Sequence, residues 1–596
     1  MQQALRAGRL LPAFYNGRFI ALSCIASAML VGCGGDGASP SGDAFTTPVV
    51  VANASAACVS LKGKTVAASL IGEPTTGAVV TSATYKTAIA DATNPGGTAV
   101  VQATPDYCEV LVDIKPVDAT APMIKAQVNL PTSWNGKKLQ FGGGGYNGTL
   151  ITGVQPSRSA GPEVPMPLTQ GYMTAGSDSG HQNTPGINAG AFALNAESLT
   201  NFAYAAPKKT NDVAIQLGLA YYAHRPLRNY YMGGSQGGRE GMMMAQRYPA
   251  DFDGIVSIDP VMNATGLWTF QNSFGAVQSA PGSWLGTKVQ LIHDTVKTAC
   301  DALDGLADGV VSNTKACTPI ASAALAALRC ASGSDEGATC LSDGQLAAVK
   351  WAYDGYKFPF ALANGMTSYA GYLYGGEALP SNFGNWVTGT AAPTADPDNT
   401  PGVGSSYLYG SYYVRYFIAK NASFNVLTYN PADFEARVKE VSNMIDATDP
   451  DLTAFFARGG KLILRQDLGD KGQSPATGLN YWDAVVAKMS KDKVDQFFAA
   501  YVASGLPHTS AGINAGTVNA PAYGIPGRLD LLPVLEGWVE KNVKPADSMT
   551  LTNRDALPPY AVIASKPLCR YGTYPKFVGT GTVGGDKATN YVCSAN

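Results

Sequence analysis

Charged residues are scarce in this chain. They make up 14% of the 596 residues, with 42 Lys and Arg against 44 Asp and Glu, which gives a formal net charge of −2. No basic patch or long charge run is present, so nucleic acid is not an expected partner. Histidine is rarer still, with four residues in all, and any histidine-dependent chemistry is therefore restricted to a few positions. Beyond the N-terminus no apolar run reaches the roughly 18–20 residues that a membrane span needs.

The N-terminus has the layout of an export signal. Arginines precede an apolar run over residues 19–31, so we expect residues 1–32 to be a signal peptide. The segment ends in Leu-Val-Gly before Cys33 and resembles a bacterial lipobox, which makes Cys33 a candidate lipid anchor; the alternative is ordinary cleavage nearby. Residues 33–50 are typical of a flexible tether. We therefore expect an exported protein, either an outer-membrane lipoprotein or a secreted or periplasmic protein.

Eight cysteines remain once Cys24, within the signal, and Cys33 are set aside. An even number in an exported chain favours disulfides, and none of the eight has the CxxC spacing of a metal site. Proximity in the sequence, and elimination for the last pair, predicts the bridges Cys300–Cys317, Cys330–Cys340, Cys569–Cys593 and Cys58–Cys108.

The order of apolar runs predicts a parallel α/β sheet with an insertion. Short apolar runs alternate with helix-like stretches in the first half, and a further strand pattern appears at residues 460–465, which is typical of an α/β fold. The chain is too long for one compact core. We expect residues 51–260 and 451–596 to form one α/β domain in two parts, with residues 261–450 inserted as a lid domain.

The predicted lid contains a dense aromatic stretch. Sixteen Phe, Trp or Tyr residues lie between Trp351 and Phe417, against 9% aromatic residues overall. Such a stretch favours a lid over a substrate pocket, and the alternative is a second structural core that buries aromatic side chains. The two interpretations are compatible.

The strongest local motif is a nucleophile elbow. Residues 233–238 read Gly-Gly-Ser-Gln-Gly-Gly, an apolar run precedes them, and good helix formers follow. The sharp strand-to-helix turn of a Gly-x-Ser-x-Gly motif needs small residues around the serine. Ser235 is therefore the candidate nucleophile of an α/β-hydrolase.

The order of residues along the chain selects the base. In α/β-hydrolases the serine is followed by the acid and then by the histidine. His181 and His224 precede Ser235, and His293 falls in the lid before any acid candidate. His508 is therefore the candidate base.

The acid should follow a strand between Ser235 and His508. Asp467 and Asp470 both come after the strand predicted at residues 461–465, and either could orient the imidazole. The intervening Leu-Gly gives Asp470 the longer reach, which favours Asp470.

Two glycine-rich features add to the site. The amide of Gln236, after the nucleophile, and an amide of the Gly142–Gly145 run are candidate oxyanion donors. Three aspartates and two glycines over residues 301–309 suit a hard cation with oxygen ligands, although the spacing is not that of an EF-hand. A solvated acidic turn is the alternative.

Together these motifs resemble the tannase and feruloyl esterase family. The resemblance covers most of the mature chain and is most specific at residues 235–243 and 300–309. It implies an α/β-hydrolase fold with a large inserted lid, Asp470 as the acid, His508 as the base, and Gly145 and Gln236 as oxyanion donors. It implies the same four disulfides. It also implies a structural calcium site whose ligands are Asp301, Asp304 and Asp308 with the carbonyls of Leu306 and Val310.

The chain departs from the family pattern at two places. The family typically has a disulfide between the residue before the serine and the residue after the histidine, which are Gly234 and Thr509 here. The lid arginine that grips a terephthalate carboxylate has no clear match. Arg415 aligns better with a different family arginine and is kept as a candidate substrate contact.

The expected function is the hydrolysis of esters of aromatic acids, such as feruloyl or galloyl esters, through an acyl-enzyme. A small-molecule aromatic ester is the expected partner, calcium is the expected cofactor, and the oligomeric state is left open. The alternatives are a terephthalate monoester hydrolase, a peptidase or lipase on the same triad, and a calcium-stabilised surface lipoprotein that binds without catalysis.

Overall fold

The computed structural model describes residues 48–183, 189–581 and 584–596. The expected signal peptide, Cys33 and nearly all of the expected tether lie outside the described residues. Within the described ranges no helix combines the length and hydrophobicity that a membrane crossing requires.

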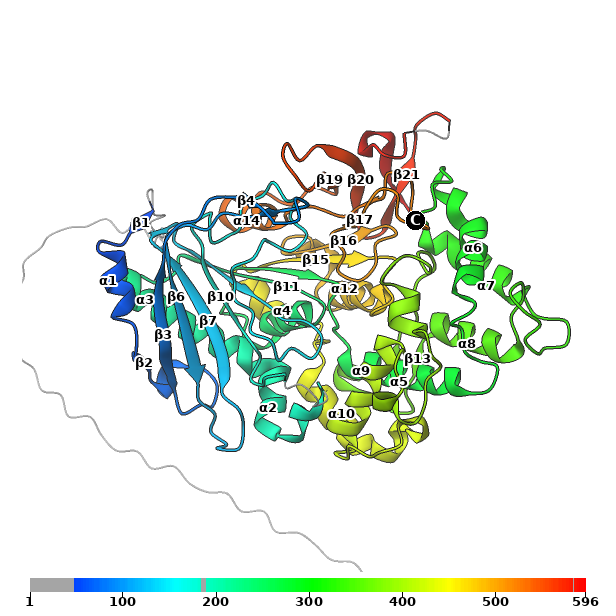
Figure 1. The fold of residues 1–596 in the computed structure, drawn as a ribbon, viewed down its shortest axis with the longest axis horizontal. Helices are drawn as coiled ribbons and strands as arrows, with labels where there is room; N and C mark the ends of the chain where they lie inside the picture. The colour runs from blue at the N-terminus through cyan, green and yellow to red at the C-terminus, as the bar shows by residue number, and fades with distance from the viewer. Residues whose placement is uncertain (1–47, 184–188, 582–583) are drawn as a thin grey trace, which may run out of the picture. The chain divides into compact units, whose positions relative to one another are not determined.

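A mixed sheet of twelve strands forms the scaffold (Figure 1). Six neighbouring strands at its centre, from β10 to β16, run parallel, and the strands on either side are antiparallel. In spatial order the strands are β19 (Ser548–Arg554), β20 (Val562–Arg570), β16 (Phe498–Ala503), β15 (Lys461–Asp467), β12 (Gly254–Ile258), β11 (Arg228–Gly234), β9 (Lys137–Phe141), β10 (Met173–Ser177), β7 (Ile124–Pro131), β6 (Tyr107–Ile114), β3 (Ala78–Lys86) and β2 (Thr65–Val66).

Helices cover both faces of the parallel strands. Successive side chains of a strand point to opposite faces, and in β11 Tyr231 packs in a core with α4 and α12, whereas Tyr230 packs in a core with α14. Outside the inserted segment the helices are α1 (Ala54–Val59), α2 (Ala196–Thr200), α3 (Ala206–Tyr222), α4 (Gln236–Arg247), α11 (Thr453–Ala457), α12 (Pro475–Met489), α13 (Lys491–Val494) and α14 (Leu532–Lys541). This arrangement confirms the predicted α/β-hydrolase fold.

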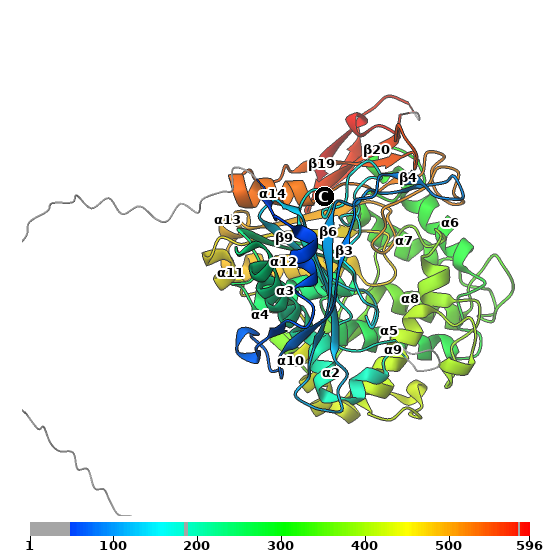
Figure 2. The same cartoon turned by 60° about the vertical axis from the view of Figure 1, so that its left-hand side comes forward.

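The inserted segment, residues 261–450, is mainly helical. Its longer helices gather beside one another in both views (Figures 1 and 2), and they are α5 (Ala264–Ser279), α6 (Val289–Cys300), α7 (Thr314–Ala326), α8 (Asp343–Asp354), α9 (Ser405–Tyr412) and α10 (Glu435–Ile445). They enclose an apolar core in which Phe383, Tyr413 and Phe417 are fully buried, and Tyr146 and Phe202 from outside the segment join this core. Part of the aromatic stretch therefore does serve as a structural core.

Short two-stranded ribbons complete the fold, and their pairs are β1 (Val49–Val50) with β8 (Ser133–Trp134), β4 (Ala92–Thr93) with β5 (Val100–Val101), β13 (Tyr356–Lys357) with β14 (Ser368–Tyr369), β17 (Gly512–Ile513) with β18 (Ile525–Pro526), and β21 (Thr573–Phe577) with β22 (Tyr591–Ala595). The four expected disulfides are all formed, at Cys58–Cys108, Cys300–Cys317, Cys330–Cys340 and Cys569–Cys593. They brace the N-terminal strands, the helical segment and the C-terminal ribbon.

Candidate active site

Ser235 lies at a strained turn between β11 and α4. Its φ is 56° and its ψ is −123°, a backbone conformation that non-glycine residues seldom adopt and that is found at functional sites. The surrounding glycines permit the turn, because a Cβ on Gly233 would lie 2.3 Å from the carbonyl carbon of Gly237. The turn leaves the Ser235 hydroxyl facing a pocket.

The three residues predicted as a triad form one hydrogen-bonded chain. His508 Nε2 lies 2.8 Å from Ser235 Oγ, and His508 Nδ1 lies 2.6 Å from Asp470 Oδ2. Asp470 is fully buried, and its carboxylate also accepts hydrogen bonds from the Gly472 and Gln473 amides and from Gln473 Nε2. These donors fix the carboxylate that orients the imidazole.

The other acid candidate, Asp467, has different partners. Its carboxylate pairs with the buried guanidinium of Arg465 at 2.7 Å and accepts the amide of Ser510. The adjacent Asp259 accepts the amides of Asp467 and Thr509. Burial and then the charges of Asp467 and Asp470 raise the pKa of Asp259 well above its usual range. Asp259 and Asp467 together hold the two residues that follow His508, through the amides of Thr509 and Ser510.

The predicted oxyanion donors line the pocket beside Ser235. Gln236 begins α4, and the first amides of a helix have no partner within the helix. Gly145 has φ 58°, and a Cβ there would lie 2.6 Å from the Tyr409 hydroxyl, so another residue would be strained and would displace Tyr409. The loop around Gly145 is fixed on both sides by the Glu240 carboxylate, which accepts hydrogen bonds from the Gly143 amide and from Asn147 Nδ2.

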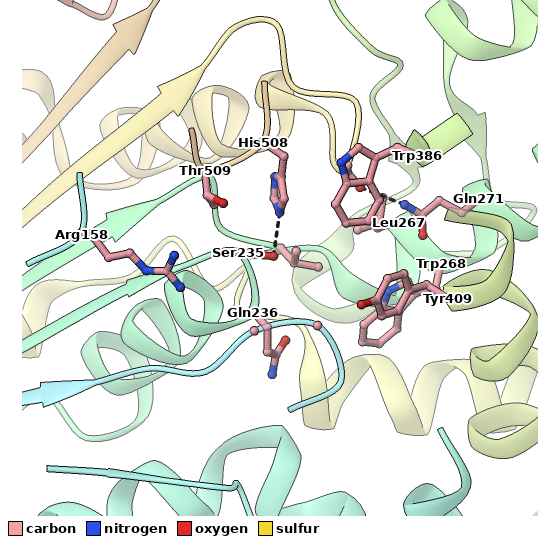
Figure 3. A pocket seen from close by; sticks show the side chains of 14 residues that line it. Arg158, Ser235, Gln236, Leu267, Trp268, Gln271, Trp386, Tyr409, His508 and Thr509 are labelled. Atoms are coloured by element: carbon pink, nitrogen blue, oxygen red, sulfur yellow. Dashed lines mark hydrogen bonds between the residues drawn. The ribbon is translucent and has the colours of Figure 1, made fainter. Parts of the chain in front are cut away.

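The pocket has an aromatic wall supplied by the inserted segment. It encloses about 220 Å³. Leu267 and Trp268 come from α5, Trp386 from the short helix η6 (Phe383–Thr388), and Tyr409 from α9. The Trp386 and Tyr409 rings stack with centroids 6.2 Å apart, and the Trp386 ring meets His508 edge-on. Figure 3 shows these rings on one side of Ser235 and Arg158 on the other.

Arg415 does not line this pocket, which corrects the expectation that it contacts substrate. Its buried guanidinium is held by Asp398 at 2.7 Å and by the carbonyls of Phe424 and Ala395. These partners take three of the five guanidinium N–H donors and hold the side chain away from the pocket. Arg158 does reach the pocket, and it was not predicted because its loop of Ser, Pro and Gln carries no motif.

The acidic turn after α6 brings three aspartates into a small region. Asp304 is buried, its Oδ1 accepts the Leu306 amide, and its Oδ2 has no partner among the described residues. Burial raises the pKa of Asp304 to about 6. Asp308 Oδ2 accepts the Tyr523 hydroxyl and the Lys566 ammonium at 2.8 and 3.1 Å. In the described chain the oxygens of Asp301, Asp304 and Asp308 do not all lie within 4.8 Å of one another.

Comparison with known proteins identifies relatives over nearly the whole chain. The model of a family described as tannase and feruloyl esterase matches residues 108–594. An uncharacterised esterase of Agrobacterium fabrum is 34% identical, with 91% of this chain and 94% of that protein covered. Mono(2-hydroxyethyl) terephthalate hydrolase of Piscinibacter sakaiensis is 27% identical, with 84% and 86% covered. The crystal structure of feruloyl esterase B from Aspergillus oryzae superposes with a TM-score of 0.71 at 22% identity, covering 91% of this chain and 100% of that one.

Proposed function

The chain belongs to the tannase and feruloyl esterase family and is a carboxylic ester hydrolase, and from this premise we propose that it cleaves esters of aromatic acids with Ser235 as nucleophile. The observation that carries the proposal is the continuous chain from Ser235 Oγ through His508 to Asp470, with contacts of 2.8 and 2.6 Å, at the floor of an aromatic-walled pocket.

In the acylation step His508 Nε2 takes the proton of Ser235 as Oγ attacks the ester carbonyl. Negative charge develops on the carbonyl oxygen, which the amides of Gln236 and Gly145 stabilise. His508 then returns its proton to the leaving alcohol, and the acyl group remains on Ser235. Asp470 keeps the imidazole in the tautomer with a free Nε2 and stabilises the imidazolium.

In the deacylation step water replaces the alcohol. The water oxygen attacks the acyl carbon while His508 takes a proton from the water. The amides of Gln236 and Gly145 again stabilise the oxyanion. Collapse of the tetrahedral intermediate breaks the bond to Ser235 Oγ, which regains the proton from His508. The products are an aromatic carboxylic acid and an alcohol, and no redox cofactor is consumed.

The aromatic wall supports an aromatic acyl group. A phenolic ring can stack against Trp386 and Tyr409, and aromatic pairs contribute roughly 0.5–1.5 kcal/mol beyond area burial. A burst of product from an activated ester, followed by slower turnover, would distinguish this enzyme from a lipoprotein that only binds. A panel of aryl, long-chain acyl and peptide substrates separates the esterase from a lipase or peptidase. Failure to cleave any aromatic ester would contradict the proposal.

Substrate preference gives a further prediction. The aromatic side of the pocket presents no arginine or lysine among the described residues, so a carboxylate on the far end of the acyl ring would be desolvated without a partner. Methyl ferulate and methyl gallate should therefore be cleaved with at least about tenfold higher kcat/KM than a terephthalate monoester, since a charge-assisted contact is worth roughly 1.5–3 kcal/mol. Steady-state kinetics at one pH test this. Faster cleavage of the terephthalate monoester would overturn it.

We also propose that calcium binds at the acidic turn, through Asp301, Asp304 and Asp308 with the carbonyls of Leu306 and Val310. The donor set suits a hard cation. The unpartnered, buried Oδ2 of Asp304 supports this assignment, and the single ammonium of Lys566 does not balance three carboxylates. Calcium binding would bring the carboxylates of Asp301, Asp304 and Asp308 closer to one another than they are in this structure. The ion would act in folding stability, away from the reacting atoms.

If calcium binds there, a chelator should lower the melting temperature of the purified protein, because an ion bound only to the native state stabilises that state by mass action. Asp304→Ala should melt at a lower temperature and should no longer respond to the chelator. Asp294→Ala, at a half-exposed aspartate on α6, is the matched control and should keep the response. Identical melting curves with and without chelator, and no calcium by elemental analysis, would exclude the site.

The four disulfides indicate an exported protein. We propose that Cys33 carries a lipid, on the basis of the lipobox-like sequence before it. Metabolic labelling with a fatty-acid probe, compared between the wild type and Cys33→Ser, tests this assignment.

A further inference from the structure

Arg158 places an uncompensated positive charge in the active-site pocket. It lines the pocket with Ser235 and His508, and no hydrogen bond or ion pair of its guanidinium is found within residues 48–183, 189–581 and 584–596. Burial alone lowers the pKa of Arg158, and no carboxylate offsets this effect. Arginine stays protonated nevertheless. Holding a half-buried charge without a partner costs free energy, so an anionic ligand would recover that cost.

The loop that carries Arg158 is held in place. The Arg158 amide donates to Met232 Sδ, and the carbonyl of Ser159 accepts the Leu529 amide at 2.7 Å. Arg528 donates to the next carbonyl, that of Ala160. The backbone of this loop is thus tied to β11 and to the segment after β18, and the guanidinium is presented from a fixed base.

The guanidinium lies beside Gly234 and Thr509. A Cβ on Gly234 would lie 3.6 Å from Arg158 Cζ and 3.2 Å from Thr509 Cγ2. A side chain that extended beyond Cβ at position 234 would approach the guanidinium. Glycine before the serine therefore leaves room for Arg158 next to the reacting groups.

Arg158 also opens onto a second cavity of about 490 Å³. Arg528 lines this cavity too, together with polar residues such as Gln102 and Ser157, and no aspartate or glutamate occurs in its described lining. Arg528 feels the charge of Glu163, whereas no carboxylate of the described chain acts on Arg158. The guanidinium of Arg158 therefore makes this side of Ser235 attractive to anions. The aromatic rings of Trp386 and Tyr409 lie on the opposite side (Figure 3).

We propose that Arg158 is a specificity residue that binds a carboxylate on the alcohol half of the substrate. The inference rests on the proposed function: if the aromatic acyl ring takes the side of Trp386, the alcohol extends past Ser235 toward Arg158. A guanidinium recognises a carboxylate with two parallel hydrogen bonds. The substrate class is an ester between an aromatic acid and a hydroxycarboxylic acid, and hydrolysis releases both acids.

Matched esters test the proposal. The feruloyl ester of glycolic acid carries the carboxylate on the alcohol, the feruloyl ester of glycolamide is its neutral counterpart, and a terephthalate monoester carries the charge on the ring. For the wild type, kcat/KM should be at least about tenfold higher for the glycolate than for the glycolamide ester. In Arg158→Gln this ratio should fall to about one, and Arg158→Lys should retain part of it because the charge remains. Arg329→Gln, which removes an exposed arginine, should leave the ratio as in the wild type.

The possible outcomes separate the two proposals. A ratio near one in the wild type, or an equal loss on both feruloyl esters in Arg158→Gln, would overturn the role of Arg158. Dependence of the terephthalate monoester alone on Arg158 would place the anion on the acyl half and would also overturn it. If the wild type cleaves none of the esters, the proposed function fails. Calorimetric binding of feruloyl glycolate to Ser235→Ala, with and without Arg158→Gln, then still tests Arg158.

Discussion

Ser235→Ala should lower kcat on a small aryl ester by about four to six orders of magnitude, and His508→Ala should do so to a similar extent. The two groups act as a unit, because the hydroxyl is a weak nucleophile until the imidazole accepts its proton. Both variants should unfold at the wild-type midpoint, since neither side chain forms part of an apolar core. Steady-state and single-turnover kinetics measure the loss, and thermal unfolding controls for the fold.

The neighbouring aspartates supply a matched pair of variants. Asp470→Asn should lower kcat by about three to four orders of magnitude, because an amide opposite Nδ1 favours the wrong tautomer. Asp467→Asn should affect kcat far less, since its carboxylate contacts Arg465 and Ser510 and not the imidazole. A larger loss of kcat in Asp467→Asn than in Asp470→Asn would show that the acid is misassigned. Turnover by Ser235→Ala at the wild-type rate would exclude Ser235 as the nucleophile.

The parts of the site that the sequence predicted depend on short stretches of chain. The nucleophile elbow could be predicted because the backbones of residues 233 and 237 lie too close for side chains. The turn therefore requires glycine at these two positions. The base was found because four histidines are few and their order along the chain excludes three. The choice between Asp467 and Asp470 rested on loop length, and the structure brings Asp470, the favoured residue, to His508.

The parts that the sequence did not predict depend on long-range contacts. Arg415 was a candidate substrate contact, but its guanidinium is held by Asp398 and by backbone carbonyls outside its own helix. Arg158 looked unremarkable in a polar loop, and only tertiary packing brings it to the pocket. The same holds for Asp259, whose contact with the Thr509 amide joins residues 250 positions apart. For Arg415, Arg158 and Asp259, no local sequence pattern indicates which partner the charged side chain contacts.

Arg465→Met should be the most destabilising of the charge substitutions considered. Arg465 and Asp467 are both fully buried on β15, with Nε and Oδ1 2.7 Å apart. The guanidinium also donates to the carbonyls of Gly527 and Ser510. Removing one partner of a buried ion pair leaves the other charge uncompensated and typically costs about 3–5 kcal/mol. Urea unfolding monitored by tryptophan fluorescence should therefore give a clearly lower midpoint than for the wild type.

Arg329→Met is the control, because Arg329 and Asp343 form a pair of similar geometry whose side chains are 50% and 59% exposed. It should barely change the midpoint, since exposed pairs contribute little. The double variant Arg465→Met/Asp467→Leu removes both buried charges and should recover part of the lost stability. Its kcat should be lower than that of the wild type, because Ser510 loses its contacts with both side chains and the loop that carries His508 is less firmly held. Equal midpoints for Arg465→Met and Arg329→Met would refute the stabilising role of the pair, and wild-type kcat in the double variant would refute its role in positioning His508.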